Sequence, residues 1–487
     1  MSKINLELVL LSFLCGVVGG AGYVWFSVVA IFGCWCWVFR VRERERGRVS
    51  RLVPWGRVSR LVPWGRVSWL SLIVCLLVFG GGWMRADYVY EERYDFVRSF
   101  VGEGQVMVSG EVVNDPVMFE SASFVTIWDS ERGGKVRMKV ARYPEYWRGQ
   151  VMMAKGRVEV DERSFESGTV FIDRSAVEAV HDPDGALGVI FGARRTVVEQ
   201  MQRLFPGSVG GFLVGIIAGG TRGLSREVSQ DVRATGLTHI VAVSGYNVAL
   251  VLQVLMFVLV AAGVARRHKL IPMTGFLVIF VLFVGASASA VRAALMGFLT
   301  VFALVSGRKR GLFLAILWSG FFMVLYDPTV LLEDRGFQLS FLATIGVSYL
   351  APLLYTGKNP IFLAFFSTLA VYLCTLPVLF SFEQFSLIGL VTNIVFVPFI
   401  PYFMILGVLV FSLSWLYFPL AALIGRLGSI VIDLYFQGIH LFAHLPFAVI
   451  QVPPMSGVMI AVYYAFLLEI WHRLGALREH HQLRREP

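Results

Sequence analysis

Polar residues interrupt an apolar stretch of this chain that is long enough to cross a membrane. Residues 237–248 include His239, Ser244, Gly245 and Asn247. Because hydrocarbon offers no water, polar side chains persist at membrane depth mainly when they face protein or a water-filled cavity. Ser244 and Gly245 either unwind a helix, which frees backbone N–H groups that attract anions, or allow two helices to pack closely. The stretch therefore predicts a polar path through a membrane.

Three further polar residues lie in later apolar runs, namely Arg292, Gln338 and Asn393. A charged side chain at mid-bilayer costs about 2.5–3.5 kcal/mol on insertion scales. Arg292 either faces a cavity, where a guanidinium can hold phosphate through two hydrogen bonds, or lies near the outer interface, where it reaches water or pairs with Asp334. Gln338 and Asn393 either line the path or bond across helices. His239 is either a structural histidine or a proton relay.

The composition establishes the class of protein that carries these residues. The chain has 487 residues, of which 56% are hydrophobic and 16% are charged, whereas soluble domains average about 25% charged residues. This balance predicts an integral membrane protein. The net charge of +10 does not require a nucleic-acid partner, because cytoplasmic loops of membrane proteins collect Lys and Arg.

Residues 1–84 are expected to form amino-terminal transmembrane spans with a basic cytoplasmic loop. Arginine is abundant in residues 40–66, so the positive-inside rule places this loop in the cytoplasm. The same nine residues occur in tandem at 48–56 and 57–65, which indicates a local duplication. Such a loop binds anionic lipid or nucleic acid, and its position beside the membrane favours lipid.

Residues 85–185 are polar, and their hydrophobic pattern has a period of two. Several short strands separated by turns predict a small all-β barrel similar to an OB-fold. The run before it crosses outward, so this OB-like domain is expected outside the cytoplasm. OB-folds often bind single strands, but here acidic residues outnumber basic ones, which argues against DNA collection as its main role. The predicted strands lie at 106–113, 136–140 and 151–160, with turns at 114–116, 133–134 and 148–149.

Residues 186–475 contain the remaining apolar runs, and charge orients them. The basic clusters at 266–269 and 308–310 fall on the same side as the basic tail, residues 476–487, which is therefore cytoplasmic. The same alternation puts the loops at 381–386 and 446–454 outside. The charged segment 221–235 also lies outside, as an interfacial helix or as a mouth that collects a polar substrate. The sequence thus predicts a polytopic α-helical membrane protein with an inserted small all-β domain.

Four segments, taken in order, resemble the ComEC competence family of bacterial inner-membrane DNA uptake proteins. Together with the amino-terminal spans and the OB-like domain, this resemblance covers nearly the whole chain. The segments are Leu-Thr-His-Ile-Val-Ala-Val-Ser-Gly-Tyr-Asn-Val at 237–248, Gly-Ala-Ser-Ala-Ser-Ala-Val-Arg-Ala-Ala-Leu-Met at 285–296, Asp-Arg-Gly-Phe-Gln-Leu-Ser-Phe at 334–341 after Asp327-Pro328, and Thr-Leu-Pro at 375–377 followed by Asn393 and Pro398.

The resemblance implies that residues 186–475 form a competence-type channel, which passes single-stranded DNA through the bacterial inner membrane during natural transformation. The residues implied along the translocation path are His239, Ser244, Gly245, Asn247, Arg292, Gln338 and Asn393. Structural or gating roles are implied for Asp334, Phe337, Pro377 and Pro398.

One feature of longer relatives is absent from the sequence. They carry a metallo-β-lactamase-like domain whose His-x-His-x-Asp-His ligands are associated with nuclease activity, and none of the 8 histidines forms such a cluster. His440 and His444 share one helix face, but the sequence offers no evident third metal ligand. We therefore expect no catalytic residue, no metal and no cofactor, and a transport protein instead of an enzyme.

The expected partners follow from what the sequence lacks. It contains no Gly-x-x-x-x-Gly-Lys-Ser/Thr loop, so a separate ATPase or strand-capturing protein on the cytoplasmic side must drive import, and a separate nuclease must degrade the other strand. Membrane lipid and single-stranded DNA complete the expected partners, while the oligomeric state stays open. Two alternatives remain, a transporter of another solute on the same scaffold and a membrane interaction protein that transports nothing.

Overall fold

The computed structural model describes residues 13–15, 17–18, 69–118, 122–220, 222–241, 245–305 and 312–483. The predicted basic loop, Ser244 and the last residues of the tail lie outside this range. The chain divides into two compact units. Unit 1 comprises Met1–Val101, Val160–Gly168 and Arg308–Asp334, and unit 2 comprises Gly102–Glu159, Thr169–Gly307 and Arg335–Pro487.

A long helix dominates the described part of unit 1. Helix α3 (Trp69–Arg98) continues beyond the apolar run into residues 85–98, where the polar domain was expected to begin. Residues 83–98 contain no Gly or Pro to stop the helix. Arg93 of α3 donates to Glu333 at 2.8 Å and to Asp327 at 3.2 Å. The other elements of unit 1 are α4 (Glu162–Ser167), α12 (Leu312–Tyr326) and η3 (Pro328–Leu331).

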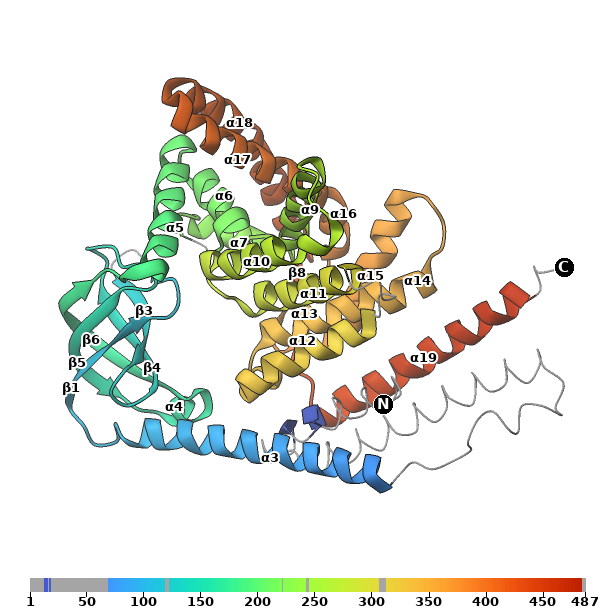
Figure 1. Cartoon of the computed structure of the whole chain (residues 1–487), viewed down its shortest axis with the longest axis horizontal. Helices are drawn as coiled ribbons and strands as arrows, with labels where there is room; N and C mark the ends of the chain where they lie inside the picture. Colours follow the sequence, from blue (N-terminus) through green and yellow to red (C-terminus); the bar gives the residue numbers. More distant parts are fainter. Residues whose placement is uncertain are drawn as a thin grey trace. The chain divides into compact units, whose positions relative to one another are not determined.

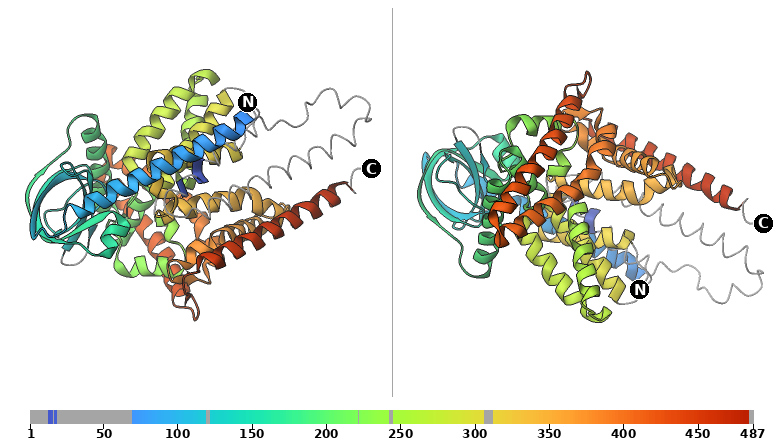
Figure 2. Two further views of the ribbon diagram at one scale, coloured as in Figure 1. Left: turned by 90° about the horizontal axis from the view of Figure 1, so that it is seen from below. Right: turned by 90° about the horizontal axis from the view of Figure 1, so that it is seen from above.

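Unit 2 begins with a closed barrel of five strands, so the prediction of a small OB-like domain is confirmed. Around the ring the strands follow the order β1-β5-β6-β4-β3, and β3 pairs again with β1. Among the described strands, the β4–β6 pairing alone is parallel, which fits the five-stranded Greek-key barrel of the OB-fold. Figure 2 shows the curled strands. The strands are β1 (Gln105–Val112), the short β2 (Val117–Met118), β3 (Ala122–Asp129), β4 (Gly134–Ala141), β5 (Val151–Glu159) and β6 (Thr169–His181).

The barrel core comes from the period of two that the sequence displays. Every second residue of β4 is buried, because alternate side chains of a strand point to opposite faces. Gly133 and Gly149 have φ of +74° and +86° at two of the predicted turns, a conformation that favours glycine. The barrel therefore folds around its own apolar centre.

The rest of unit 2 is helical. In chain order the elements are α5 (Gly185–Leu204), α6 (Ser208–Ala218), α7 (Arg226–Ala234), α8 (Thr238–Val241), α9 (Gly245–Ala261), η2 (Arg266–His268), α10 (Leu270–Val284), α11 (Ala288–Val305), α13 (Arg335–Ile345), the π-helical turn η4 (Gly346–Leu350), α14 (Ala351–Leu354), α15 (Pro360–Phe380), β7 (Gln384–Ser386), α16 (Gly389–Phe396), η5 (Val397–Phe399), α17 (Ile400–Leu416), α18 (Phe418–Ala443), β8 (Val449–Gln451) and α19 (Gly457–Leu483).

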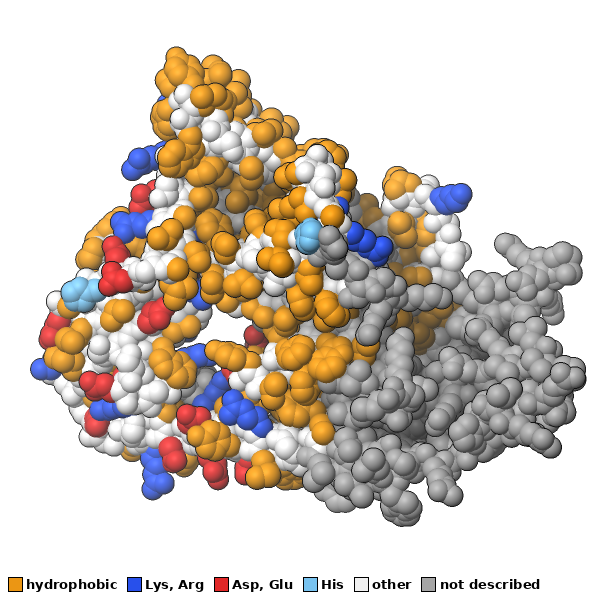
Figure 3. Space-filling view, viewed as in Figure 1, with side chains coloured by type: hydrophobic (Ala, Val, Ile, Leu, Met, Phe, Trp, Pro, Cys, Tyr) orange, Lys and Arg blue, Asp and Glu red, His pale blue; other side chains and the backbone are white. Residues whose placement is uncertain are grey.

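Six helical segments among the described residues are long and apolar enough to cross a membrane. They run over Thr238–Ala261, Arg335–Leu354, Pro360–Phe380, Gly389–Leu416, Phe418–Ala443 and Gly457–Gly475. Figure 1 shows α17 and α18 as an antiparallel pair. In Figure 3 apolar side chains cover that pair, whereas charged side chains gather over the barrel. The chain is thus a multi-pass membrane protein that carries a small polar barrel.

Candidate functional site

Arg292 occupies a buried position in α11. Only 6% of the residue is exposed, and its guanidinium carbon lies 5.8 Å from the centre of the Phe341 ring on α13. Its Nε and Nη1 atoms are buried and have no hydrogen-bond partner among the described residues. A buried, unsatisfied guanidinium is costly. Such a group is a candidate for binding an anion that is not part of the chain.

Gly245 lies directly against this guanidinium. A Cβ atom added at Gly245 would come within 3.0 Å of Nη2 of Arg292. A side chain at this position would require the end of the arginine to move by a few tenths of an ångström, and glycine avoids this. Two residues predicted for the path, 47 positions apart by their numbers, thus meet in space.

Helix α13 contributes the third side of this site. Gln338 lies one turn before Phe341 and so shares its helix face, and it is partly exposed. Phe337 is 4% exposed and its ring centre lies 4.4 Å from that of Phe341. The structure therefore places the predicted path residue Gln338 and the predicted gating residue Phe337 on the helix that faces Arg292.

The other predicted path residues lie elsewhere. Asn247 is 2% exposed and donates to the carbonyl of Ile216 on α6 at 3.0 Å, which is a structural bond between helices. His239 is exposed on α8. Oδ1 of Asn393 on α16 is buried without a hydrogen-bond partner among the described residues. Ser244 lies outside the described residues, so its predicted role stays untested.

Pro377 interrupts the hydrogen bonding of α15, and a side chain of α19 supplies the missing donor. Proline has no N–H, so the carbonyl four residues earlier, that of Leu373, loses its helical donor. The hydroxyl of Tyr463 donates to this carbonyl at 2.7 Å. Pro398 lies in η5, where α16 passes into α17. Asp334 is partly buried at the end of a segment of unit 1.

A cluster of arginines links the barrel to the helices, and sequence reasoning missed it. Arg194 of α5 donates to both carboxylate oxygens of Asp115, at 2.6 and 2.5 Å, and to the carbonyls of Ala218 and Gly219, both at 3.1 Å. It is 4% exposed, and each of its three guanidinium nitrogens has an acceptor. This arginine therefore ties the turn after β1 to the start of the helical region.

Arg222 lies in the same cluster but is less completely bonded. Its guanidinium carbon is 3.9 Å from the ring centre of Trp147, and Arg195 lies 5.2 Å from that centre. Burial lowers the pKa of Arg222 below its ordinary value, and likewise the pKa of Arg148. Proteins bind single-stranded nucleic acid through aromatic side chains, on which the bases stack, and through arginine. Arg222 belongs to the segment predicted as a mouth, but its pairing with the barrel required the fold.

One group of described residues has the chemistry of metal ligands. Asp231, His440 and His444 bring one carboxylate and two imidazoles close together. The first comes from α7 and the other two from the end of α18. The sequence had suggested the histidine pair without a third ligand.

The fold and the buried arginine define a class, a multi-pass membrane protein with a small OB-like barrel. The family described as Competence protein matches residues 216–476, more than half of the chain, and the chain belongs to this family. The predicted membership in a competence family is thus confirmed. The matched region contains every residue predicted for the path.

Comparison with curated proteins gives the same result. The chain is similar to ComE operon protein 3 of Bacillus subtilis (strain 168), with 28% identity over 246 residues. The matched part is 49% of this chain and 31% of that relative, so the match covers less than a third of the relative's length. No solved structure matches this chain.

Proposed function

We propose that this protein is a channel for uptake of single-stranded DNA across the bacterial inner membrane during natural transformation. Family membership supports a role in competence. The observation that carries the proposal is Arg292, a buried guanidinium beside Gly245, two of whose nitrogens find no acceptor in the described part of the chain. A phosphate group reaching this position would supply the missing acceptors through charge-assisted hydrogen bonds.

Transport requires that each contact be weak. A polyanion moves only if it binds well enough to enter and loosely enough to leave, as in ion channels with several sites. A single arginine flanked by Phe341, Gln338 and a glycine suits this demand better than a dense cluster of charges.

The arginines at the barrel junction suit an entry site. Arg222 and Trp147 offer one stacked cation and one aromatic face. The barrel itself carries more acidic than basic residues, so this junction, not the barrel surface, is the place where a strand would first be held. In this proposal the barrel holds the segment 221–235 in the orientation that receives the strand.

The predicted orientation agrees with one pairing in the fold. Strands β7 and β8 join residues 384–386 to residues 449–451, and the charge pattern had put both loops outside. The segment 221–235 was also predicted to lie outside. Its helix α7 contacts the end of α18 that leads into residues 446–454. In this proposal a separate motor or strand-capturing protein in the cytoplasm drives the import, and a separate nuclease is a further partner.

The test is uptake of labelled DNA into a strain that lacks this gene. The strain is complemented with the wild type, with Arg292→Ala, or with the control Arg473→Ala. Arg473 is an exposed arginine of α19 whose side chain is 76% exposed and pairs with Glu469. We expect uptake with the wild type and the control, and loss with Arg292→Ala at equal protein level in the membrane.

Other results would point to the alternatives. Unchanged uptake in the deletion strain would remove DNA import and leave transport of another solute or a role in assembly. Uptake that needs the protein but tolerates Arg292→Ala would show that the buried arginine is structural.

A further inference from the structure

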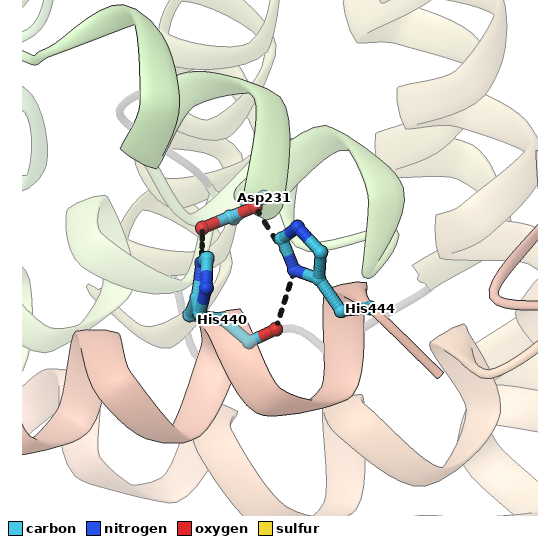
Figure 4. A group of neighbouring side chains, drawn as sticks. All are labelled: Asp231, His440 and His444. Carbon is cyan, nitrogen blue, oxygen red and sulfur yellow. Dashed lines mark hydrogen bonds and ion pairs between the residues drawn. The ribbon is translucent and has the colours of Figure 1, made fainter. Parts of the chain in front are cut away.

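Three side chains converge on one point at the junction of α7 and α18 (Figure 4). Nδ1 of His440 lies 2.8 Å from Oδ2 of Asp231, and Nδ1 of His444 lies 4.0 Å from Oδ1 of the same carboxylate. One nitrogen or oxygen of each side chain lies within 4.8 Å of the others. The three therefore form a compact set of nitrogen and oxygen donors.

The local structure positions these groups well for a ligand. His440 and His444 are four residues apart, so both imidazoles project from one face of α18, and their ring centres are 4.1 Å apart. The Asp231 side chain is only 11% exposed, while those of His440 and His444 are 49% and 65% exposed. The carboxylate is thus held by the fold, and an ion can reach it from the side of the histidines.

We propose that Asp231, His440 and His444 bind a divalent transition-metal ion of the Zn²⁺ class. Zn²⁺ takes imidazole nitrogen and carboxylate oxygen at about 2.0–2.2 Å, and three protein ligands leave one position for water. Donors around such an ion lie about 3.3 Å apart in a tetrahedral arrangement, which is between the separations observed here. Two imidazoles disfavour Ca²⁺ and Mg²⁺, which prefer oxygen ligands.

Closing the site requires only a small change at His444. Its Nδ1 lies 3.0 Å from the carbonyl of His440, and that contact is lost when the ring turns to an ion. The carbonyl keeps a donor, because the backbone N–H of His444 also points to it at 3.2 Å. The His440–Asp231 contact is already in place.

The ion would join two elements that the sequence separates by about 200 residues. Helix α7 leads through Thr235, whose carbonyl accepts from Thr392 at 2.7 Å, into the segment 237–248. A metal bridge would therefore fix the entry to this segment against α18. The inference does not depend on DNA being the transported molecule.

The experiment uses the full chain, purified in detergent without a histidine tag and stripped of metal. Titration with Zn²⁺ alone by calorimetry, and with Co²⁺ alone by visible absorption, should reveal one saturable site. Asp231→Asn, His440→Gln and His444→Gln should each weaken the affinity at least about 100-fold. The control His472→Gln alters an exposed histidine of α19 and should leave the affinity unchanged.

Metal-free melting temperatures separate ligand loss from unfolding. His444→Gln retains the 2.8 Å contact between His440 and Asp231, so its melting temperature without metal should equal that of the wild type. Zn²⁺ should raise the melting temperature of the wild type but not of this variant. Equal Zn²⁺ affinity in the wild type and all three ligand variants, or no saturable site in the wild type, would overturn the proposal.

Discussion

Replacing Arg292 by methionine separates a functional arginine from a structural one, because the two roles predict opposite changes in stability. Two nitrogens of its guanidinium have no hydrogen-bond partner among the described residues, so methionine removes a desolvated charge and keeps most of the side-chain volume. An arginine at the centre of a membrane helix costs up to about 3.5 kcal/mol, and water in a polar path offsets part of this cost. We expect unfolding in detergent to become more difficult by up to about 3 kcal/mol, while DNA uptake is lost.

The same substitution at Arg194 is the matched control. Arg194 is as buried as Arg292 but bonds to Asp115 and to two carbonyls. Removing one partner of a buried ion pair costs about 3–5 kcal/mol, and the side chain of Asp115 is 23% exposed, which reduces the penalty. Arg194→Met should therefore destabilise the protein by about 2–4 kcal/mol.

The assay is the free energy of unfolding, measured by titration of detergent micelles with a denaturing detergent and followed by circular dichroism. DNA uptake is measured in parallel with matched protein levels. The reasoning is refuted if Arg292→Met lowers the unfolding free energy as much as Arg194→Met does. Such a result would mean that Arg292 stabilises the fold and does not bind a ligand.

Three further outcomes follow from the structure. Gly245→Val should displace the guanidinium beside it and reduce DNA uptake as strongly as loss of the arginine, whereas Gly275→Val, where an added Cβ meets nothing within 4 Å, should leave uptake unchanged. Tyr463→Phe should lower the unfolding free energy by about 1 kcal/mol, because the carbonyl of Leu373 loses its donor. In a Pro377→Ala background a backbone N–H can donate to this carbonyl again, so the same substitution should cost clearly less. The isolated barrel should bind single-stranded DNA with a Kd no tighter than about 10⁻⁵ M in a filter-binding assay, and a tight complex would show that local basic patches outweigh its net negative charge.

The barrel and the path residues differ in how far sequence reasoning could describe them. Alternation of apolar residues is a local property, so the three expected strands correspond closely to β1, β4 and β5. The continuation of helix α3 to Arg98 was not expected. Polar residues without a helix breaker are compatible both with a helix and with the start of the polar domain. Helix α3 is held there by Arg93 and its two carboxylate partners, which lie more than 230 residues away in the sequence.

Among the path residues, only some proved to be neighbours. Gly245 and Arg292 meet, and Gln338 lies on the helix that supplies Phe341. Asn247 bonds instead to the carbonyl of Ile216. A polar residue in an apolar run always needs a partner, but its type and spacing do not say whether that partner is a carbonyl of the next helix or a passing ligand.

By itself, the sequence determined that this is a multi-pass membrane protein with a β-barrel insert and competence-family motifs. Those features depend on composition, hydrophobic period and the order of motifs along the chain, which can be read without knowledge of tertiary contacts. Only the tertiary structure decided that Arg292 is buried with too few acceptors among the residues that the structure describes, that Arg194 bonds to Asp115, and that Asp231 joins His440, 209 residues away. Helix packing brings such residues together, and it depends on the whole surface of each helix rather than on any one motif.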